Sequence, residues 1–294
     1  MPTFSVIIPT YNRLSQLQAT LASVWSQTFT DYEVIVVDDG SSDDTPAYLS
    51  SLGDRITVQR QTNAGPGVAR NNGAANTRGA YLAFLDSDDL WFPWTLQTVA
   101  ELIDKHDQPS LISASLRQFE DPRELEGVKP TATVADVYRD FLASSDRHYF
   151  IGAGMTFVRR DKFLEVGGFC AHPINLEDHD LILRLGTAPG FVRILEPPTL
   201  GYRYQSNGRT SESQRSFAGC KYVIENEQQG IYPGGKMRRV DRRKIITRHV
   251  RPWALTFKRM GEWQTAWSLY KSTFVWNVSL HRWRFLLGFW ANFS

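Results

Sequence analysis

The first ninety residues alternate short apolar runs with segments of helical periodicity. Apolar runs rich in β-branched residues predict buried strands at residues 4–8, 34–37, 56–59 and 81–85. Apolar residues spaced by three or four predict a helix over 14–25, and residues 43–52 also look helical. Gly65-Pro66-Gly67 opens a third helix over 65–76, with Pro66 suited to its first turn. Strands that alternate with helices are typical of βαβ units and a parallel sheet.

Residues 91–219 continue this pattern less regularly. We predict helices over 94–105 and 176–185, strands over 111–116 and 152–158, and loops over 120–133 and 205–216, the last of them mobile. An α/β domain with a mostly parallel central sheet is therefore predicted over residues 1–219, in halves 1–90 and 91–219. A basic, Trp-rich and mainly helical extension follows over residues 220–294.

Three polar clusters directly follow predicted strands, at residues 9–13, 38–42 and 86–89. Ligands bind outside the carboxyl ends of strands in such sheets, so we expect the clusters to line one crevice. The charges of Asp86, Asp88 and Asp89 repel one another unless a cation or hydrogen-bond donors compensate them. A Mg²⁺ or Mn²⁺ ion holding a diphosphate would do so. Taken alone, the cluster is better explained as an acidic turn capping a helix over 90–94.

Three other groups each allow a functional and a structural interpretation. Asp38 and Asp39 suit contacts with a nucleotide base or ribose, or else a tight turn. Arg70 suits a base or phosphate contact, or else a solvent-facing position on a helix. Glu177 and Asp178 suit a general base that takes the proton of an attacking hydroxyl, or else acids favoured at a helix N-terminus. The residues alone leave these alternatives open.

Composition excludes several classes of function. The net charge of +2 gives no general electrostatic reason to bind nucleic acid. The histidines lack zinc-site spacing, and no G-x-S-x-G elbow, Walker motif or convincing dinucleotide fingerprint occurs. We expect Cys170 and Cys220 to be free thiols in a reducing compartment. With no secretory signal and no apolar stretch of membrane-spanning length, we expect a cytoplasmic location.

The order and spacing of these groups are more specific than any one of them. Four segments closely resemble successive motifs of the family 2 glycosyltransferases: 5–13 (SVIIPTYNR), 36–45 (VVDDGSSDDT), 65–73 (GPGVARNNG) and 84–89 (FLDSDD). Gly167-Gly168-Phe169 and Glu177-Asp178 follow in the expected order. The resemblance covers residues 3–205 and implies the GT-A fold, a nucleotide-binding α/β sandwich.

By this resemblance the chain would be a metal-dependent, inverting glycosyltransferase of polysaccharide biosynthesis. It would move a sugar from a nucleotide sugar, with UDP-sugars expected, to a saccharide or lipid-linked acceptor. Asp178 matches the catalytic base of the family. Asp88 matches the direct ligand of Mn²⁺ or Mg²⁺, and Asp86 completes the D-x-D motif. The donor-contacting positions of the family are matched by Pro9, Thr10, Tyr11, Asn12, Arg13, Asp39, Arg70 and Asp86.

One departure from the family concerns a late histidine. Many relatives carry a His soon after a Tyr-Arg pair, whereas here Tyr202-Arg203-Tyr204 leads into Gln205. A contact to the diphosphate or metal is therefore missing. We expect Arg203 or Arg209 to replace it, on a loop that closes over the donor.

The extension gathers basic and aromatic residues. Residues 236–251 hold eight basic residues and one acid, and residues 252–294 hold six of the nine tryptophans. This combination suits an anionic membrane surface, and it would place the enzyme at the inner face of the membrane, near lipid-linked acceptors. The alternative is a helical appendage whose aromatic residues pack on the catalytic domain or on a second subunit.

Two other functions fit a related α/β fold. Nucleotidyl transfer would require a Gly-rich loop with a Lys or Arg directly after the first strand, which residues 9–13 do not supply. A non-catalytic relative would be expected to lack Asp39, Asp88 or Asp178, and all three are present.

Overall fold

The computed structural model describes residues 1–204 and 213–291, and the chain divides into two compact units. The sheet unit comprises residues 1–140, 150–173 and 188–206. The helical unit comprises residues 141–149, 174–187 and 207–294. Each unit is therefore assembled from three separate segments of the sequence.

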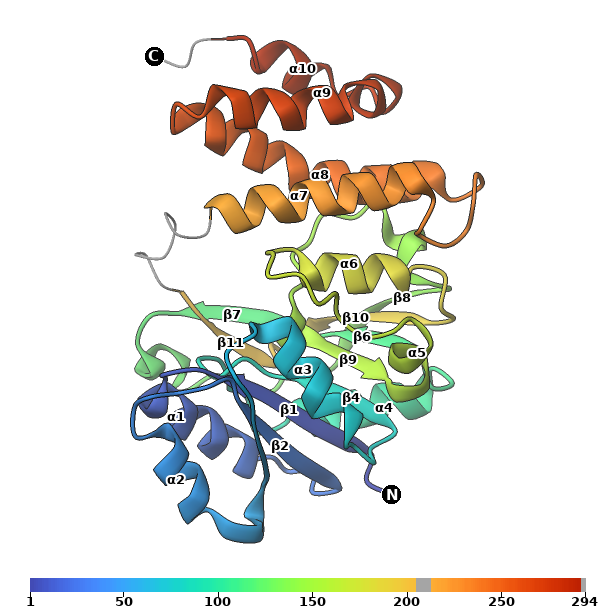
Figure 1. Cartoon of the computed structure of the whole chain (residues 1–294). Coiled ribbons are helices and arrows are strands. Elements are labelled where there is room, and N and C mark those ends of the chain that lie inside the picture. Colours follow the sequence, from blue (N-terminus) through green and yellow to red (C-terminus); the bar gives the residue numbers. More distant parts are fainter. Residues whose placement is uncertain (205–212, 292–294) are drawn as a thin grey trace. The chain divides into compact units, whose positions relative to one another are not determined.

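The sheet unit is built on an eight-stranded sheet with the order β3-β2-β1-β4-β9-β6-β10-β8 (Figure 1). Its parallel half consists of β3 (Thr57–Arg60), β2 (Tyr32–Asp38), β1 (Phe4–Thr10) and β4 (Tyr81–Phe84). The other half is mixed: β6 (Leu111–Ser113) and β10 (Phe191–Glu196) are parallel, while β9 (Thr156–Arg159) and β8 (Val134–Tyr138) run antiparallel to their neighbours. The predicted parallel βαβ arrangement is thus confirmed for the first ninety residues.

A second, three-stranded sheet has the order β5-β11-β7, formed by Leu90–Trp91, Leu200–Arg203 and Leu116–Phe119. It shows that the single strand predicted over 111–116 is wrong, because this run is divided between β6 and β7. The division occurs at Ser115, whose Oγ donates to the Leu195 carbonyl at 2.9 Å and whose carbonyl accepts from the Thr199 amide at 2.8 Å. These bonds replace continuation of the β6 ladder.

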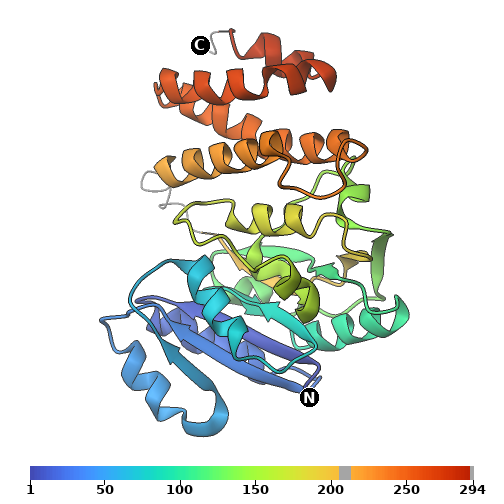
Figure 2. The ribbon, with the colours of Figure 1, turned by 45° about the vertical axis from the view of Figure 1, so that its right-hand side comes forward.

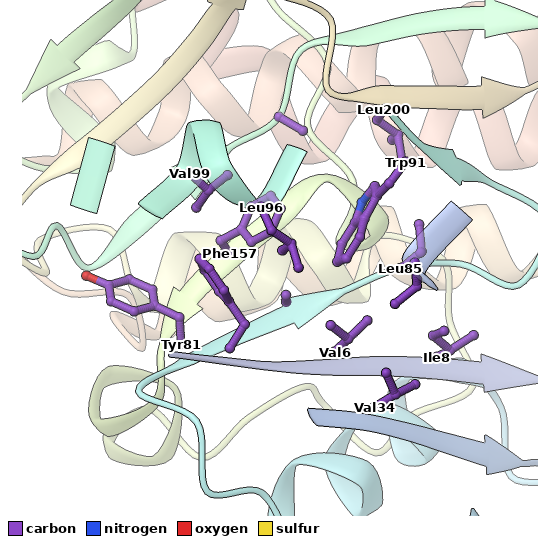
Figure 3. Packing of buried hydrophobic residues seen from close by; sticks show 14 of the residues in the cluster. Val6, Ile8, Val34, Tyr81, Leu85, Trp91, Leu96, Val99, Phe157 and Leu200 are labelled. Atoms are coloured by element: carbon purple, nitrogen blue, oxygen red, sulfur yellow. The ribbon is translucent and has the colours of Figure 1, made fainter. Parts of the chain in front are cut away.

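Helices cover both faces of the parallel half. On one face, α1 (Leu14–Trp25), α2 (Thr45–Ser51) and α4 (Thr95–Lys105) bury apolar side chains in one cluster with alternate residues of β1 and β2. Figure 3 shows part of this cluster, with Leu96 and Val99 of α4 near Phe157. On the other face lies α3 (Pro66–Ala75), which Figure 2 shows across the strands. The close approach of α3 requires Gly73, since a Cβ there would lie 2.7 Å from Ile7. This packing fixes the carboxyl ends of the strands, where the polar clusters follow.

The remaining short elements of the sheet unit are η1 (Gly53–Arg55), η2 (Pro122–Leu125), η4 (Ala153–Met155) and α5 (Arg160–Glu165). The predicted strand over 152–158 therefore begins later than expected, because η4 occupies its first half. Cys170 of this unit and Cys220 of the helical unit form no disulfide, as predicted.

The helical unit contains η3 (Phe141–Ser144), α6 (Glu177–Arg184), α7 (Ser213–Gln229), α8 (Arg239–Arg259), α9 (Trp263–Ser279) and α10 (Trp283–Gly288). The predicted helical character of the C-terminal region is confirmed. Residues 213–216, predicted as loop, instead begin α7, and the boundary predicted after residue 219 lies inside this helix. Within the described residues, no helix combines the length and the apolarity needed to cross a membrane.

Candidate active site

The loops after β1 and β2 are fastened to each other by Asn12. Its Oδ1 accepts hydrogen bonds from the backbone amides of Ser42 at 2.7 Å and Asp43 at 3.3 Å, and its own amide donates to Ser41 Oγ at 2.9 Å. Asn12 adopts a φ of 51°, a conformation that asparagine tolerates better than most residues. Two of the three predicted clusters therefore lie side by side.

Asp39 is buried and holds the segment that leads into α3. Its Oδ1 accepts from Gln61 Nε2 at 2.7 Å and from the Ala64 amide at 2.8 Å, and its Oδ2 accepts from the Gly65 amide at 2.9 Å. Gly65 has a φ of 90°, which suits glycine, and Pro66 then begins the helix. Asp39 therefore acts as a turn residue, as one of the two interpretations predicted. Its Oδ2 keeps one lone pair for a further donor.

Arg70 points into the protein rather than into solvent. It is 4% exposed, and its Nη2 lies 2.5 Å from Asp86 Oδ1. The Phe169 ring lies under the guanidinium, 5.3 Å from its centre. The solvent-facing interpretation of Arg70 is therefore wrong.

The Gly-Gly-Phe motif supports this arginine through Asn71. Asn71 Nδ2 donates to the Phe169 carbonyl and its Oδ1 accepts from the Phe169 amide, both at 2.8 Å. Gly168 has a φ of 70°, and a Cβ there would lie 2.4 Å from Asn71 Oδ1. Sequence reasoning missed Asn71, although its place directly after Arg70 was a possible signal.

Arginines also surround the rest of the acidic cluster. Arg13 Nη1 pairs with Asp88 Oδ2. The Arg203 amide donates to Asp89 Oδ1 at 2.9 Å, its Nε donates to the Asp88 carbonyl at 3.0 Å, and its guanidinium lies 4.6 Å from the Phe119 ring centre. The third predicted cluster is thereby tied to the loop after β1. The alternative that residues 86–89 cap a helix is wrong, because Leu90–Trp91 form strand β5.

Crowding of carboxylates changes their acidity. Burial raises the pKa of Asp88, with Asp86 adding to the rise and Arg13 opposing it. Burial, then Asp86, raise the pKa of Asp89 to about 8, against the Arg203 amide. A cation placed among these groups would favour their charged forms.

Asp86 and Asp88 supply hard oxygen donors of the kind that Mg²⁺ and Mn²⁺ prefer. Gly154 lies close beside Asp86, where a Cβ would be 3.0 Å from Oδ2. Across the two described stretches of the chain, no three His, Cys, Asp or Glu side chains are grouped to hold a metal. The hard oxygens of Asp86 and Asp88 fit an ion that takes one or two protein carboxylates.

The other predicted residues have distinct surroundings. Pro9 and Thr10 are buried at the end of β1, and Thr10 Oγ1 has no hydrogen-bond partner within the described residues. Tyr11 is exposed. Gln205 and Arg209 lie outside the described residues.

Asp178 belongs to the helical unit and is the second residue of α6. Its Oδ1 accepts from the His179 amide and lies 2.7 Å from His179 Nδ1. The residue before α6, Leu176, has a φ of 70°, unusual for a branched side chain. The structure thus groups the predicted donor residues within one unit and places the predicted base in the other.

Comparisons with known proteins agree on one family. The sequence profile described as glycosyl transferase family 2 matches residues 5–167. An uncharacterized glycosyltransferase of Haemophilus influenzae is 31% identical over 202 residues, which are 66% of this chain and 66% of that protein. A PGL/p-HBAD biosynthesis glycosyltransferase of Mycobacterium bovis is 39% identical over 116 residues, 38% of this chain and 45% of that protein. The matches therefore span less than two thirds of these relatives.

Solved structures share the fold at low identity. The crystal structure of S. aureus TarS residues 1–349 in complex with UDP-GlcNAc has a TM-score of 0.68 and 20% identity, covering 87% of this chain and 73% of that one. The mannosyltransferase PcManGT from Pyrobaculum calidifontis, in complex with GDP-Man and Mn²⁺, has a TM-score of 0.57 and 17% identity, covering 93% and 75%. The predicted GT-A fold is confirmed. Since the family profile spans more than half of its residues, the chain belongs to glycosyl transferase family 2.

Proposed function

We propose that this chain is an inverting, metal-dependent glycosyltransferase that transfers a sugar from a nucleoside-diphosphate sugar to an acceptor hydroxyl. The observation that carries the proposal is the cluster at the carboxyl edge of the parallel strands, where Asp86 and Asp88 lie beside Arg70 and Arg13. Cations and carboxylates brought together at a strand edge suit a charged phosphate ligand and its counter-ion.

The loops after β1 and β2 are proposed to bind the nucleotide. Asp39 would accept a base N–H with the remaining lone pair of Oδ2. The Thr10 hydroxyl, which has no partner among the described residues, offers a hydrogen bond at the neighbouring strand end. UDP-sugars are the proposed donors, supported by the UDP-GlcNAc complex of TarS, whereas the PcManGT complex contains GDP-Man.

Asp88, with Asp86 beside it, is proposed to hold Mn²⁺ or Mg²⁺. The bound ion would neutralise charge on the departing diphosphate. The pairing of Arg13 with Asp88 is partly exposed, so the arginine can move to a phosphate when a metal takes the carboxylate. Arg70, buried and held over Phe169, keeps its place at Asp86.

Arg203 is proposed to stand in for the late histidine of the family. It is fixed to the acidic cluster by its contacts to Asp88 and Asp89. Replacement of both Arg203 and Arg209 by alanine should weaken donor binding and turnover. Unchanged donor affinity and rate would remove this assignment.

Asp178 is proposed as the general base. Asp178 stands in the first turn of α6, where the helix dipole favours a negative charge. It would take the proton of the acceptor hydroxyl as that oxygen attacks the anomeric carbon. One base and one displacement give inversion.

Two substitutions test the two roles separately. A thermal-shift screen of UDP-, GDP- and dTDP-sugars with Mn²⁺ first identifies the donor. Asp88→Ala should abolish both the metal-dependent shift and turnover, and Asp178→Asn should keep the shift while lowering turnover by about 10³-fold or more. Asp104→Asn, on an exposed site of α4, is the matched control. A full rate for Asp178→Asn would refute the base assignment.

Peripheral membrane contact is proposed for the exposed faces of α9 and α10. In the basic run, Arg238, Arg242 and Lys244 pair with Asp241, Glu227 and Asp146, so much of its charge serves the helical unit itself. Trp263, Trp267, Phe274, Trp283 and Trp290 are at least 37% exposed. Residues 252–294 hold five basic residues and one acid, which complements an anionic lipid surface.

Flotation of the full chain with phosphatidylglycerol vesicles tests this surface. The double change Trp263→Ser and Phe274→Ser should reduce flotation, as should Lys271→Ser with Arg284→Ser. Lys236→Ser with Arg239→Ser, exposed in the basic run, is the matched control and should reduce it less. Equal flotation of wild type and the aromatic variant would remove the proposal.

A further inference from the structure

His179 is attached to the proposed base by two contacts. Its backbone amide donates to Asp178 Oδ1 at 2.7 Å, and its Nδ1 lies 2.7 Å from the same oxygen. An ionised carboxylate only accepts hydrogen bonds, so an ionised Asp178 at this distance requires a proton on Nδ1. One carboxylate oxygen is therefore held from two directions by a single residue.

The other side of His179 meets helix α8. The His249 ring packs edge-to-face on the His179 ring, with centroids 3.8 Å apart. His179 Nε2 is buried and makes no hydrogen bond within the described residues. With no hydrogen bond at Nε2, the orientation of the ring depends on Asp178 at Nδ1 and on the packing of His249.

Burial and neighbouring charges shift the pKa values of His179 and His249 in opposite directions. Burial alone lowers the pKa of His179, but the charge of Asp178, their hydrogen bond and Glu177 together raise it above its usual value. Burial, then His179 and Arg248, hold the pKa of His249 well below its usual value, and Asp178 opposes them.

Next to the pair, burial lowers the pKa of Arg248. Arg282 adds to this decrease, whereas Tyr149 and Asp146 oppose it. On α6, Asp180 is engaged by Arg184 of its own helix and by Asn226 of α7. Because the pKa of His179 is raised and that of His249 is lowered, His179 is the ring that takes a charge, and His249 stays neutral.

We propose that His179 and His249 form a two-ring support that positions the Asp178 carboxylate: Nδ1 of His179 holds one oxygen, and the His249 ring holds His179 in that orientation. This proposal rests on the proposed role of Asp178 as the base. It makes α8 a part of the catalytic apparatus, because the helix acts on Asp178 through His179. His179 and His249 are positioning residues and need not touch the substrate.

Nitrogen-15 NMR of the histidine rings in the full chain tests the support without any substrate. Wild type should show His179 protonated at Nδ1 and His249 neutral at pH 7. Asp178→Asn should lower the pKa of His179, and His249→Ala should change the His179 ring signals. A His179 that carries its proton only on Nε2, or that titrates identically in Asp178→Asn, would overturn the proposal.

Kinetics then test the positioning role with the sugar nucleotide that turns over fastest among the UDP-, GDP- and dTDP-sugars. His179→Leu should lower kcat by about 100-fold with the donor KM unchanged, since a small misplacement of a base is costly. Its acidic limb of the kcat–pH profile should also move. His179→Asn should recover most of the rate, because its amide nitrogen stands near the position of Nδ1. The exposed His281→Asn is the control.

Two results distinguish the positioning role of His179 and His249 from the assignment of Asp178 as the general base. Equal rates and pH profiles for His179→Leu and His179→Asn would overturn the support. Full activity of Asp178→Asn would instead refute the base assignment, and the NMR result would still report whether the rings hold this carboxylate.

Discussion

Asp86 and Asp88 of the sheet unit are held in a different way from Asp180 and Glu227 of the helical unit. In the sheet unit, Asp86 and Asp88 are 32% and 17% exposed, and the Arg13 that pairs with Asp88 is 42% exposed. In the helical unit, Asp180 and Glu227 are fully buried and meet several partners. Asp180 accepts from Arg184, Asn226 and Tyr232, and Glu227 pairs with Arg242 and Arg243.

This difference separates charges that can exchange partners from charges that hold helices together. A partly exposed ion pair can open to admit a ligand at little cost, since such pairs contribute little to stability. A buried carboxylate with several partners cannot, because loss of a partner leaves its charge unpaired in the interior. Asp178 belongs to the helical unit and lies two residues from Asp180. At 18% exposed, it nevertheless resembles Asp86 and Asp88 of the sheet unit in its partial exposure.

The largest effect is expected where a buried pair of the helical unit is broken. Arg242→Leu removes the 2.6 Å partner of the buried Glu227 and leaves Arg243 at 3.6 Å, and it should lower the free energy of unfolding by about 3–5 kcal/mol. Urea denaturation followed by circular dichroism measures this change.

The control for this prediction is the exposed pair of Lys221 and Glu225 on α7, 3.7 Å apart. Lys221→Leu should change stability by less than about 0.5 kcal/mol. Similar losses of unfolding free energy in Arg242→Leu and Lys221→Leu would show that the burial of Glu227 does not make its ion pair more important for stability.

Two adjacent glycines test the sheet unit. Both Gly167 and Gly168 have positive φ values, 79° and 70°, so alanine at either position costs about 1–2 kcal/mol of backbone strain. Only at Gly168 would the Cβ also strike Asn71, while nothing lies within 4 Å at Gly167. Gly168→Ala should therefore also disturb Phe169 beneath Arg70 and weaken donor binding by about tenfold. Donor affinity is measured by titration calorimetry. Equal affinity in the two variants would show that the Gly-Gly-Phe motif does not influence donor binding through Arg70.

The sequence predicted the parallel half of the sheet unit to within about three residues, because apolar runs and helical periodicity agree there with the final packing. It could not predict the division at Ser115, since an apolar run does not reveal which strand will pair with it. Residues 213–216 were mistaken for loop because their polar composition matches both a loop and the exposed start of a helix.

The sequence predicted which residues belong to the candidate site, but it did not predict the contacts between them. The motifs located Asp39, Arg70, Asp86 and Asp178 along the chain. The clamp between Asn71 and Phe169 joins positions 98 residues apart, and the meeting of His179 with His249 depends on how α8 packs. Such partners have no local signal, because only the folded chain brings them together.

The smallest effect concerns pH and the two histidines of the helical unit. The raised pKa of His179 adds stability below its unfolded value of 6.5, and this is lost as the pH rises through the folded pKa. The lowered pKa of His249 adds stability above 6.5, and this is lost as the pH falls through the folded pKa. The two contributions act on opposite sides of pH 6.5, so together they should give wild type its greatest stability near that pH.

Removing either ring should expose the contribution of the other. His249→Phe keeps an aromatic ring on His179, and its stability should be level below pH 6.5 and fall as the pH rises above 6.5 through the folded pKa of His179. His179→Leu should show the reverse slope, because the burial of neutral His249 then acts alone. Urea titrations at several pH values measure both slopes. Parallel slopes in the two variants would mean that the two rings do not hold opposite charge states.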